Sequence, residues 1–261
     1  MLDSFTIGGV TFHLYGFFIG LAVVLGLNVT EAMLAKSGWN AKKTWLLALA
    51  VMVGGIVGAR VWHVLTDFEL YRASILRAVY FWNGGMSILG AIAGGLLVIF
   101  AVVRSRAERL QVLDALAFAL PVAQAVGRLG NWANQELYGL PTRLPWKLYI
   151  SPERRLPGFE DQAYYHPLFA YEAFALLALV SVLWLLSKKG FGGIFGTGRY
   201  FLWYVCSYAV LRFLLDFLRM DVQRVWWGMG INQLFLLCCL FAIGLWRMIA
   251  MRKAASLSRH A

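Results

Sequence analysis

The sequence predicts an all-α integral membrane protein with about seven transmembrane helices and a small external head between the fourth and fifth. Three observations favour this class. Hydrophobic residues make up 61% of the 261 positions, above the share of roughly 45–50% that is usual in soluble domains. The apolar stretches are long enough to cross a hydrocarbon layer, which takes about 20 helical residues. Short basic segments, rather than strand patterns, separate them, and residues 1–261 are expected to form a single polytopic domain.

The expected spans are Phe12–Met33, Thr44–Leu65, Gly85–Val103, Val112–Val126, Pro167–Ser187, Tyr200–Phe217 and Gly230–Met248. No lysine or arginine precedes the first span, so it resembles a retained helix rather than a secretory signal. The fourth is short and contains Asp114 and Pro121, which also fits a kinked or partly re-entrant helix. Glycines four residues apart predict close helix packing in the first three spans, at Gly16 and Gly20, Gly54 and Gly58, and Gly90 and Gly94.

Basic residues are more frequent in the loops after the odd-numbered spans than in the loops after the even-numbered ones. The positive-inside rule therefore places the N-terminus outside and the C-terminus in the cytoplasm. The same rule, with anionic lipid, accounts for the formal net charge of +11, so no nucleic-acid partner is expected.

Residues 128–166 form the one long interruption, with four prolines and charges of both signs. A segment of this length is uncommon in a compact bundle unless it has a function. A role in substrate gating or docking is one interpretation, and a passive surface loop is the other. The cysteines Cys206, Cys238 and Cys239 fall inside expected spans without metal-ligand spacing, so no disulfide, metal or cofactor is predicted.

The segment Gly127–Gly139 reads G-R-L-G-N-W-A-N-Q-E-L-Y-G and follows the fourth apolar stretch directly. In lipid every buried polar group needs a partner or a task, so this dense polar run is expected to be a reactive site. The topology brings other polar residues to the same outer boundary: Tyr15, Arg60, His63, His166, Glu172, Tyr208, Arg212 and Asp216.

Arginines dominate this expected cluster. Arg212 and Asp216 lie four residues apart and could simply pair, and Arg60 could extend its charge to the membrane surface. However, three arginines from different helices exceed what one aspartate neutralises, and the guanidinium fork suits a phosphate. A phospholipid head group is therefore predicted to supply the missing anion.

These residues resemble the bacterial prolipoprotein diacylglyceryl transferases. Gly127–Gly139 matches the family signature G-R-x-G-N-F-x-N-x-E-x-x-G, with Trp132 in the aromatic position. The supporting matches run in order along nearly the whole chain: His13-Leu14-Tyr15-Gly16, Gly58-Ala59-Arg60, Gly84-Gly85-Met86-Ser87, His166-Pro167, Tyr171-Glu172 and Tyr208 to Phe213.

The resemblance implies an enzyme that transfers the diacylglyceryl group of phosphatidylglycerol to the lipobox cysteine of a preprolipoprotein signal peptide. A thioether forms and glycerol phosphate leaves. It also implies a multi-pass protein of the bacterial cytoplasmic (inner) membrane, in contact with membrane lipids. Arg128 and Arg212 are expected at the phospholipid head group, together with Arg60 and Asp216, while Tyr15, Asn131, Glu136, Gly139 and Tyr208 match other functional positions.

The chain departs from the family pattern at three positions. Leu89 stands where many members have a histidine proposed as the base, Asp216 replaces a glutamate, and Phe169 replaces a polar residue. His63, nearly one helical turn after Arg60, is the first candidate for a substitute base. A hydrogen-bonded interfacial histidine is its alternative role, and Glu136 is another candidate acceptor.

Two other functions remain open at this point. One is a catalytically weakened paralogue that binds phosphatidylglycerol or lipoprotein precursors, which the replacement at Leu89 favours. The other is an anion transporter, although no internal repeat of the kind many transporters contain is found.

Overall fold

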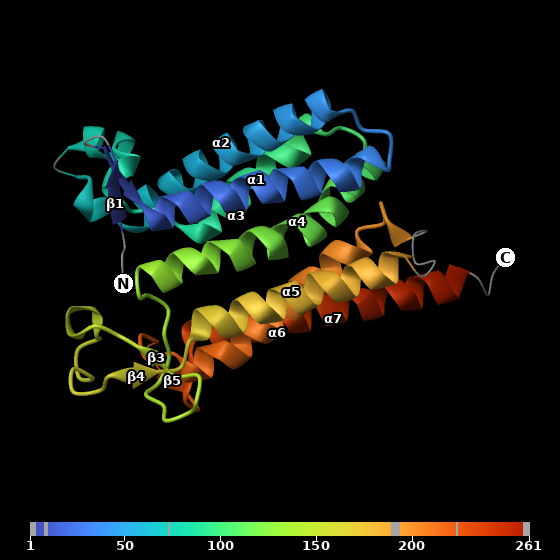
Figure 1. Cartoon of the computed structure of the whole chain (residues 1–261). Helices are drawn as coiled ribbons and strands as arrows, with labels where there is room; N and C mark the ends of the chain where they lie inside the picture. The colour runs from blue at the N-terminus through green and yellow to red at the C-terminus, as the bar shows by residue number, and fades with distance from the viewer. Residues whose placement is uncertain (1–3, 8–9, 73, 189–193, 223, 258–261) are drawn as a thin grey trace. The chain divides into compact units, whose positions relative to one another are not determined.

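Seven α-helices account for most of the computed structural model (Figure 1), which describes residues 4–7, 10–72, 74–188, 194–222 and 224–257. The helices are α1 (Leu14–Ala35), α2 (Ala41–Thr66), α3 (Ile88–Val102), α4 (Arg106–Ala133), α5 (Leu168–Lys188), α6 (Arg199–Leu215) and α7 (Ile231–Leu257). Each overlaps one predicted span, so the predicted all-α fold class is confirmed.

Within the described residues, six helices are long and apolar enough to cross a membrane. The exception is α3, whose 15 residues extend about 22 Å at the usual helical rise. A hydrocarbon core is about 30 Å thick. The chain is a multi-pass membrane protein in which α3 is the shortest apolar helix.

The fourth helix is longer than the sequence indicated. The predicted span Val112–Val126 was wrong in its bounds, because α4 runs for 28 residues and passes through Pro121. Polar residues toward its two ends, such as Glu108 and Arg128, lower the hydropathy on both sides of the apolar middle. The first half of the Gly127–Gly139 segment is therefore helical.

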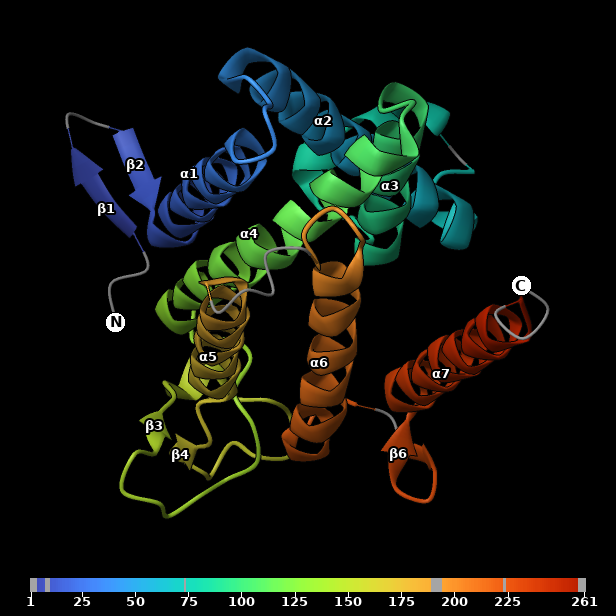
Figure 2. The ribbon, with the colours of Figure 1, turned by 90° about the vertical axis from the view of Figure 1, so that its right-hand side faces the viewer.

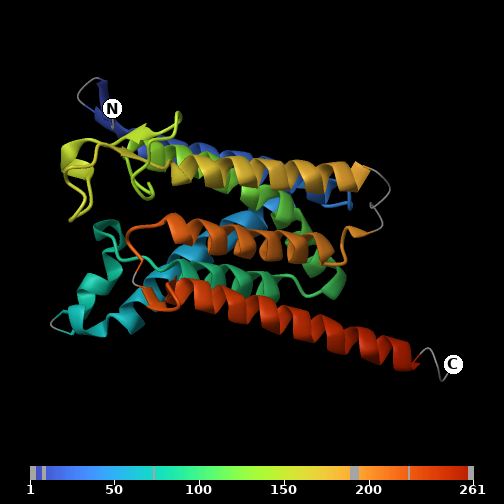
Figure 3. The ribbon, with the colours of Figure 1, turned by 90° about the horizontal axis from the view of Figure 1, so that it is seen from below.

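One compact unit consists of Gly26–Ala119 and Ser187–Phe201. In it α2 and α3 lie side by side (Figure 3). A Cβ added at Gly58 would collide with the carbonyl of Gly90, and one added at Gly94 with the carbonyl of Gly54. The prediction of close packing is confirmed for these glycines and is wrong for Gly16 and Gly20, where an added Cβ would meet nothing within 4 Å.

A buried carboxylate holds the start of α6 in the same unit. Asp114 on α4 is fully buried, and its Oδ2 accepts hydrogen bonds from the backbone N–H groups of Gly196, Thr197 and Gly198. Its Oδ1 accepts a fourth from Phe201 at 3.1 Å. A negative charge at a helix N-terminus complements the helix dipole. Asp114 thus has a structural task inside an otherwise apolar helix.

The other compact unit consists of Met1–Leu25, Leu120–Leu186 and Leu202–Ala261. Its long loop, predicted as the external head, lies at the end where α5 begins (Figure 2). Strands β3 (Leu148–Tyr149) and β4 (Tyr164–Tyr165) pair there. Tyr165 of β4 forms a small buried core with Tyr138 and Ile150. The loop therefore has hydrophobic packing of its own.

The described residues form three antiparallel strand pairs that were not predicted. Besides β3 and β4, strand β1 (Ser4–Ile7) pairs with β2 (Val10–His13), and β5 (Arg224–Trp226) pairs with β6 (Met229–Gly230). Strands of two to four residues are too short to produce a recognisable alternation of apolar and polar side chains.

Candidate active site

Side chains from α4, α5 and α6 converge on one buried carboxylate. Glu172 on α5 has no exposed surface. Its Oε1 accepts hydrogen bonds from Arg128 Nη2 at 2.6 Å and from the Tyr208 hydroxyl at 2.9 Å. Its Oε2 accepts one from Arg212 Nη1 at 3.0 Å. The Glu172 cluster is defined as Arg128, Asn131, Glu172, Tyr208, Arg212 and Asp216.

Helical spacing brings the remaining members into this cluster. Arg128 and Asn131 lie three residues apart on α4, and Arg128 Nη1 donates to Asn131 Oδ1 at 3.1 Å. Arg212 lies four residues before Asp216, to which its Nη2 donates at 3.1 Å. Residues at these separations share one helix face. The predicted residues Arg128, Asn131, Tyr208, Arg212 and Asp216 therefore come together.

The charges in this cluster differ from the sequence prediction. Glu172 and Asp216 are both buried and each pairs with Arg212, while Arg128 pairs with Glu172. Two carboxylates thus face two arginines, and the expected excess of positive charge is absent from this cluster. The sequence had placed Glu172 at the same boundary without giving it a role, although a glutamate in an apolar helix was the available signal.

Hydrogen-bonding capacity nevertheless remains unused in the cluster. Among the described residues, Arg128 Nε and Asp216 Oδ2 are buried and have no hydrogen-bond partner. Buried polar atoms are almost always paired in native proteins. One open donor and one open acceptor therefore lie in the same group of side chains, as expected of a site that takes a polar ligand.

A third arginine extends the cluster beyond α6. Arg219 Nη1 lies 3.7 Å from Asp216 Oδ1, and its Nε and Nη2 donate to the two oxygens of Asp221 at 2.9 and 2.6 Å. The hydrogen bond from Arg219 is the largest cause that lowers the pKa of the Asp221 carboxyl. The sequence had assigned neither residue a role, although Arg219 follows Asp216 by one helical turn.

The turn after α4 presents Glu136 on an unusual backbone. Gln135 and Leu137, on either side of it, have φ angles of 54° and 55°. Such values are uncommon for residues other than glycine and are often found at functional sites. The Glu136 side chain is exposed, and its Oε1 accepts a hydrogen bond from Asn134 at 3.1 Å. The predicted residue Glu136 is thus held in a strained turn next to α4.

Two other predicted residues make close packing contacts in the same unit. A Cβ at Gly139 would lie 2.8 Å from the carbonyl oxygen of Leu218 and 2.9 Å from Leu168 Cγ. Tyr15 lies against Gly130, where an added Cβ would be 2.9 Å from the Tyr15 ring. Glycine at both places lets neighbouring segments approach, and these contacts place Tyr15 beside α4.

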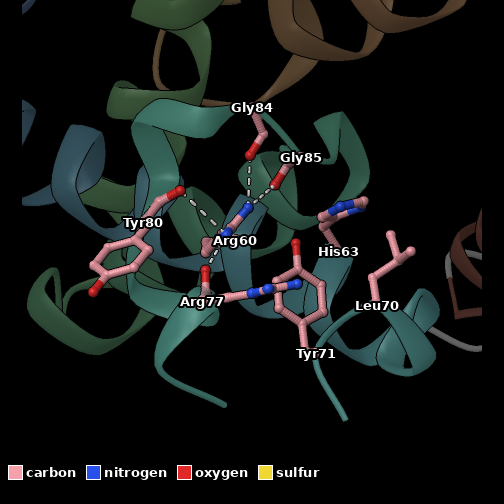
Figure 4. A pocket seen from close by; sticks show the side chains of 8 residues that line it. All are labelled: Arg60, His63, Leu70, Tyr71, Arg77, Tyr80, Gly84 and Gly85. Carbon is pink, nitrogen blue, oxygen red and sulfur yellow. Dashed lines mark hydrogen bonds between the residues drawn. The ribbon is translucent and has the colours of Figure 1, made fainter. Parts of the chain in front are cut away.

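The other unit contains Arg60, whose five N–H groups all bond to backbone carbonyls. Figure 4 shows the bonds from this side chain to Arg77, Tyr80, Gly84 and Gly85. Its Nε donates to Ala78, its Nη1 to Gly84 and Gly85, and its Nη2 to Arg77 and Tyr80, at distances from 2.6 to 3.3 Å. This arrangement is called the Arg60 staple. It holds the short turns η2 (Ile75–Val79) and η3 (Phe81–Asn83) and the Gly84-Gly85 segment against α2.

His63 and Arg60 both line a pocket next to the Gly84-Gly85 segment (Figure 4). Its Nδ1 is 2.9 Å from Asp67 Oδ2, and its Nε2 faces Gly85 so closely that an added Cβ there would collide with it. With the Nδ1 hydrogen donated to Asp67, Nε2 keeps its lone pair. His63 therefore contacts the Gly84–Ser87 segment that leads to Leu89 in the first turn of α3.

Comparisons with known proteins identify the family. A model of the prolipoprotein diacylglyceryl transferase family matches residues 3–250. The chain belongs to this family. It is similar to the phosphatidylglycerol–prolipoprotein diacylglyceryl transferase of Cutibacterium acnes, with 37% identity over 84% of this chain and 75% of the relative. It is also similar to phosphatidylglycerol–prolipoprotein diacylglyceryl transferase 2 of Streptomyces coelicolor, with 39% identity over 87% of this chain and 72% of the relative.

A third relative, from Acaryochloris marina, carries the same name as the first and is 36% identical over 84% of this chain and 80% of its own length. The resemblance stated from the Gly127–Gly139 signature is thus confirmed at the level of the family. In this family member the signature arginine, Arg128, is bound to the buried Glu172.

Proposed function

We propose that this chain transfers the diacylglyceryl group of phosphatidylglycerol to the cysteine of a prolipoprotein, with the Glu172 cluster as the centre that binds the phospholipid head group. Family membership supports the reaction. The observation that carries the site is the pairing of Arg128 and Arg212 on one buried glutamate, which leaves Arg128 Nε without a partner among the described residues.

The reaction forms one bond and breaks one bond at the same carbon. The cysteine sulfur attacks the glyceryl CH₂ that carries the phosphate, a C–S bond forms, and the C–O bond to phosphate breaks. The thiol proton goes to a base, and glycerol phosphate leaves with the bonding electrons. Negative charge therefore grows on the phosphate oxygens as the reaction proceeds.

Arg128 and Arg212 are suited to stabilise that charge. A guanidinium group directed at the place where charge develops contributes roughly 3–4 kcal/mol per donor, by analogy with oxyanion holes. Glu172 fixes both side chains before substrate arrives, so little reorganisation is needed. The open oxygen of Asp216 can accept a hydrogen bond from a hydroxyl of the glycerol head group. Asn131 accepts a hydrogen bond from Arg128, and Tyr208 donates one to Glu172, so both help to hold these side chains in place.

The nucleophile is a thiolate, and a free cysteine has a pKa near 8.5, so a base raises its reactive fraction. We assign this role to His63, because Asp67 fixes its tautomer and Leu89 cannot accept a proton. Glu136, displayed by its strained turn, is the second candidate acceptor. The contact of His63 with Gly85 supports this choice. Gly85 lies four residues before Leu89, the position at which many family members carry a histidine.

Arg60 was also predicted to bind the head group. The contacts of its guanidinium favour another role, because they leave no N–H free for a phosphate. A positioning role is the better proposal. By holding the backbone from residue 77 to residue 85, Arg60 fixes the segment that leads into α3.

The same proposal includes the location and orientation of the chain. The protein substrate is expected to be an exported signal peptide with a lipobox cysteine, and the phospholipid to enter from the surrounding membrane. The site then faces the outer side of a bacterial cytoplasmic membrane, with the N-terminus outside and the C-terminus inside. The loop with β3 and β4 becomes an external head beside the substrate.

The test uses purified full-length protein, phosphatidylglycerol and a lipobox peptide, with mass spectrometry to detect the diacylglyceryl adduct. Wild-type protein is expected to form the adduct, and Arg128→Ala and Arg212→Ala to lose it while still inserting into membranes. Saturable phosphatidylglycerol binding without any adduct would contradict the proposal. His63→Gln is expected to slow thioether formation, and to slow it less at alkaline pH, where the thiol ionises without a base; unchanged turnover would exclude His63 as the base.

A further inference from the structure

The β5–β6 hairpin lies between two candidate membrane spans. One span ends at Leu218 and the next begins at Ile231, so the hairpin occupies part of the short link of residues 219–230. Strand residues advance about 3.3 Å each, so Trp227, four residues before Ile231, lies within about 13 Å of the start of α7. Figure 2 shows β6 directly at that end of α7. Covalent connection alone keeps this hairpin close to a membrane surface.

The tip of the hairpin has a backbone that its sequence does not favour. Trp226 pairs with Met229, and the two residues between them, Trp227 and Gly228, have φ angles of 47° and 72°. Positive φ at both central residues is typical of a two-residue turn in which asparagine followed by glycine is strongly preferred. A bulky tryptophan in this conformation is a rare outlier. Folding of the hairpin does not explain the presence of Trp227.

Large apolar side chains are exposed at this tip. The exposed fractions are 56% for Trp226 and 83% for Trp227, and Val225 is exposed as well. The two indole rings stack in parallel, with centroids 4.8 Å apart and an angle of 15°. The rings therefore form one flat apolar surface at the end of the hairpin.

The base of the hairpin is rigid. Arg224 Nη2 donates to the carbonyls of Asp216, Phe217 and Arg219, and its Nη1 donates to Gly228 at 3.1 Å. Gln233 on α7 is fully buried; it accepts from the N–H of Gly230 and donates to the carbonyl of Phe213. The tryptophan pair is thus fixed relative to the segment that carries Asp216.

We propose that the Trp226–Trp227 pair is an interfacial anchor that inserts into the phospholipid head-group layer beside α6 and α7. Tryptophan is enriched at that depth because its ring is apolar and its indole N–H is polar. The head-group layer is about 5–8 Å thick on each side of the hydrocarbon core, so all of it lies within reach of the hairpin tip. The charged neighbours Arg219 and Arg224 stay occupied at the hairpin base and leave the rings as the contact surface.

The experiment compares tryptophan fluorescence of the full chain and of Trp227→Asn, both reconstituted in vesicles of phosphatidylethanolamine and phosphatidylglycerol. The difference between the two spectra isolates the tip, since the rings at 226 and 227 stack on each other. A nitroxide on the lipid head group is expected to abolish this difference signal, and the aqueous quencher acrylamide is expected to leave it. Quenching by acrylamide alone would overturn the proposal in favour of a water-exposed tip.

A signal that neither reagent quenches would also overturn it, because the tip would then be covered by protein, such as a second copy of this chain. Asparagine suits the turn, so Trp227→Asn is expected to unfold in detergent at the same temperature as wild type or higher. Trp227→Phe provides a matched variant that keeps the apolar ring and loses the indole emission. If Trp227→Asn fails to fold, the difference spectrum between wild type and Trp227→Phe gives the same test.

Discussion

The Glu172 cluster and the Arg60 staple are both built around arginine, but their guanidinium groups are bound in different ways. In the staple one arginine bonds to five backbone carbonyls and has no N–H left. In the cluster two arginines share one buried glutamate, and Arg128 Nε remains without a partner among the described residues. A saturated guanidinium can only hold structure, whereas an unsaturated one beside a fixed counter-ion has a donor left for a ligand. The number of arginines therefore does not distinguish the proposed site from the staple.

The counter-ions make the difference. Backbone carbonyls carry no net charge, so Arg60 keeps its positive charge. It has no N–H group left, however, with which to bind and orient a ligand. Glu172 neutralises part of the charge of Arg128 and Arg212 and, through separate oxygens, orients each of them. Four substitutions test the roles of these regions and their surroundings. They follow in decreasing order of the expected effect.

The largest effect is expected from Glu172→Gln. The substitution leaves Arg128 and Arg212 buried without their shared counter-ion, and removing one partner of a buried ion pair costs about 3–5 kcal/mol. Adduct formation is expected to fall to background, and the thermal unfolding midpoint in detergent to drop. Glu69→Gln is the control, because Glu69 pairs with Arg72 on the surface and should change neither. Wild-type activity in Glu172→Gln would show that the cluster is not the catalytic centre.

Arg60→Lys tests the staple. Lysine supplies three donors on a flexible stem where five carbonyls need partners, so the segment from residue 77 to residue 85 is expected to loosen. Hydrogen exchange of its amides should rise, and adduct formation should slow by about 10- to 100-fold, as expected for a displaced supporting residue. Unchanged exchange at these amides would contradict the structural role of Arg60.

Gly139→Ala tests the close approach inside the signature. The new methyl group would press on the carbonyl of Leu218 and on Leu168, and overpacking of this kind costs about 1–3 kcal/mol. The unfolding midpoint is expected to fall. Gly20→Ala is the matched control, since an added Cβ there meets nothing within 4 Å, and alanine in a helix should raise the midpoint slightly. Equal effects of the two changes would argue against tight packing at Gly139.

The smallest effect is expected from Asp221→Asn. The hydrogen bond from Arg219 lowers the pKa of Asp221 in the folded protein, so the pair stabilises the fold above the ordinary aspartate pKa of about 3.9. That stability is lost as the pH falls through the lowered folded pKa. The pair is partly exposed and is worth about 0.2–1 kcal/mol. Midpoints of the variant and the wild type should differ at pH 7 and converge in acid; a constant difference would exclude this linkage.

The sequence predicted the helices and the arginines of the cluster well. Long apolar stretches have few alternatives in lipid, and the spacing of Arg128 with Asn131, and of Tyr208 with Arg212, follows directly from the helical period. The bounds of α4 were missed because a hydropathy argument ends a helix where polar residues begin. Here those polar residues have partners, such as Glu172 for Arg128, so the helix continues.

The contacts of the proposed site and of the Arg60 staple were harder to predict from the sequence. The carbonyls bound by Arg60 belong to an irregular loop whose backbone path no periodic pattern specifies. Glu172 was visible as a charge in an apolar helix, but its two partners lie on helices distant in sequence. The positive φ angles of Gln135 and Trp227 contradict local preference, and propensity arguments therefore could not predict them.

The most direct test of the central claim is the rate of adduct formation as a function of phosphatidylglycerol concentration for Arg128→Lys and Arg60→Lys. If the Glu172 cluster binds the head group, Arg128→Lys will raise the KM for phosphatidylglycerol, because lysine cannot reproduce the guanidinium fork that reaches both Glu172 and the phosphate. Arg60→Lys will lower kcat and leave that KM unchanged. A raised KM in Arg60→Lys with an unchanged KM in Arg128→Lys would contradict the account.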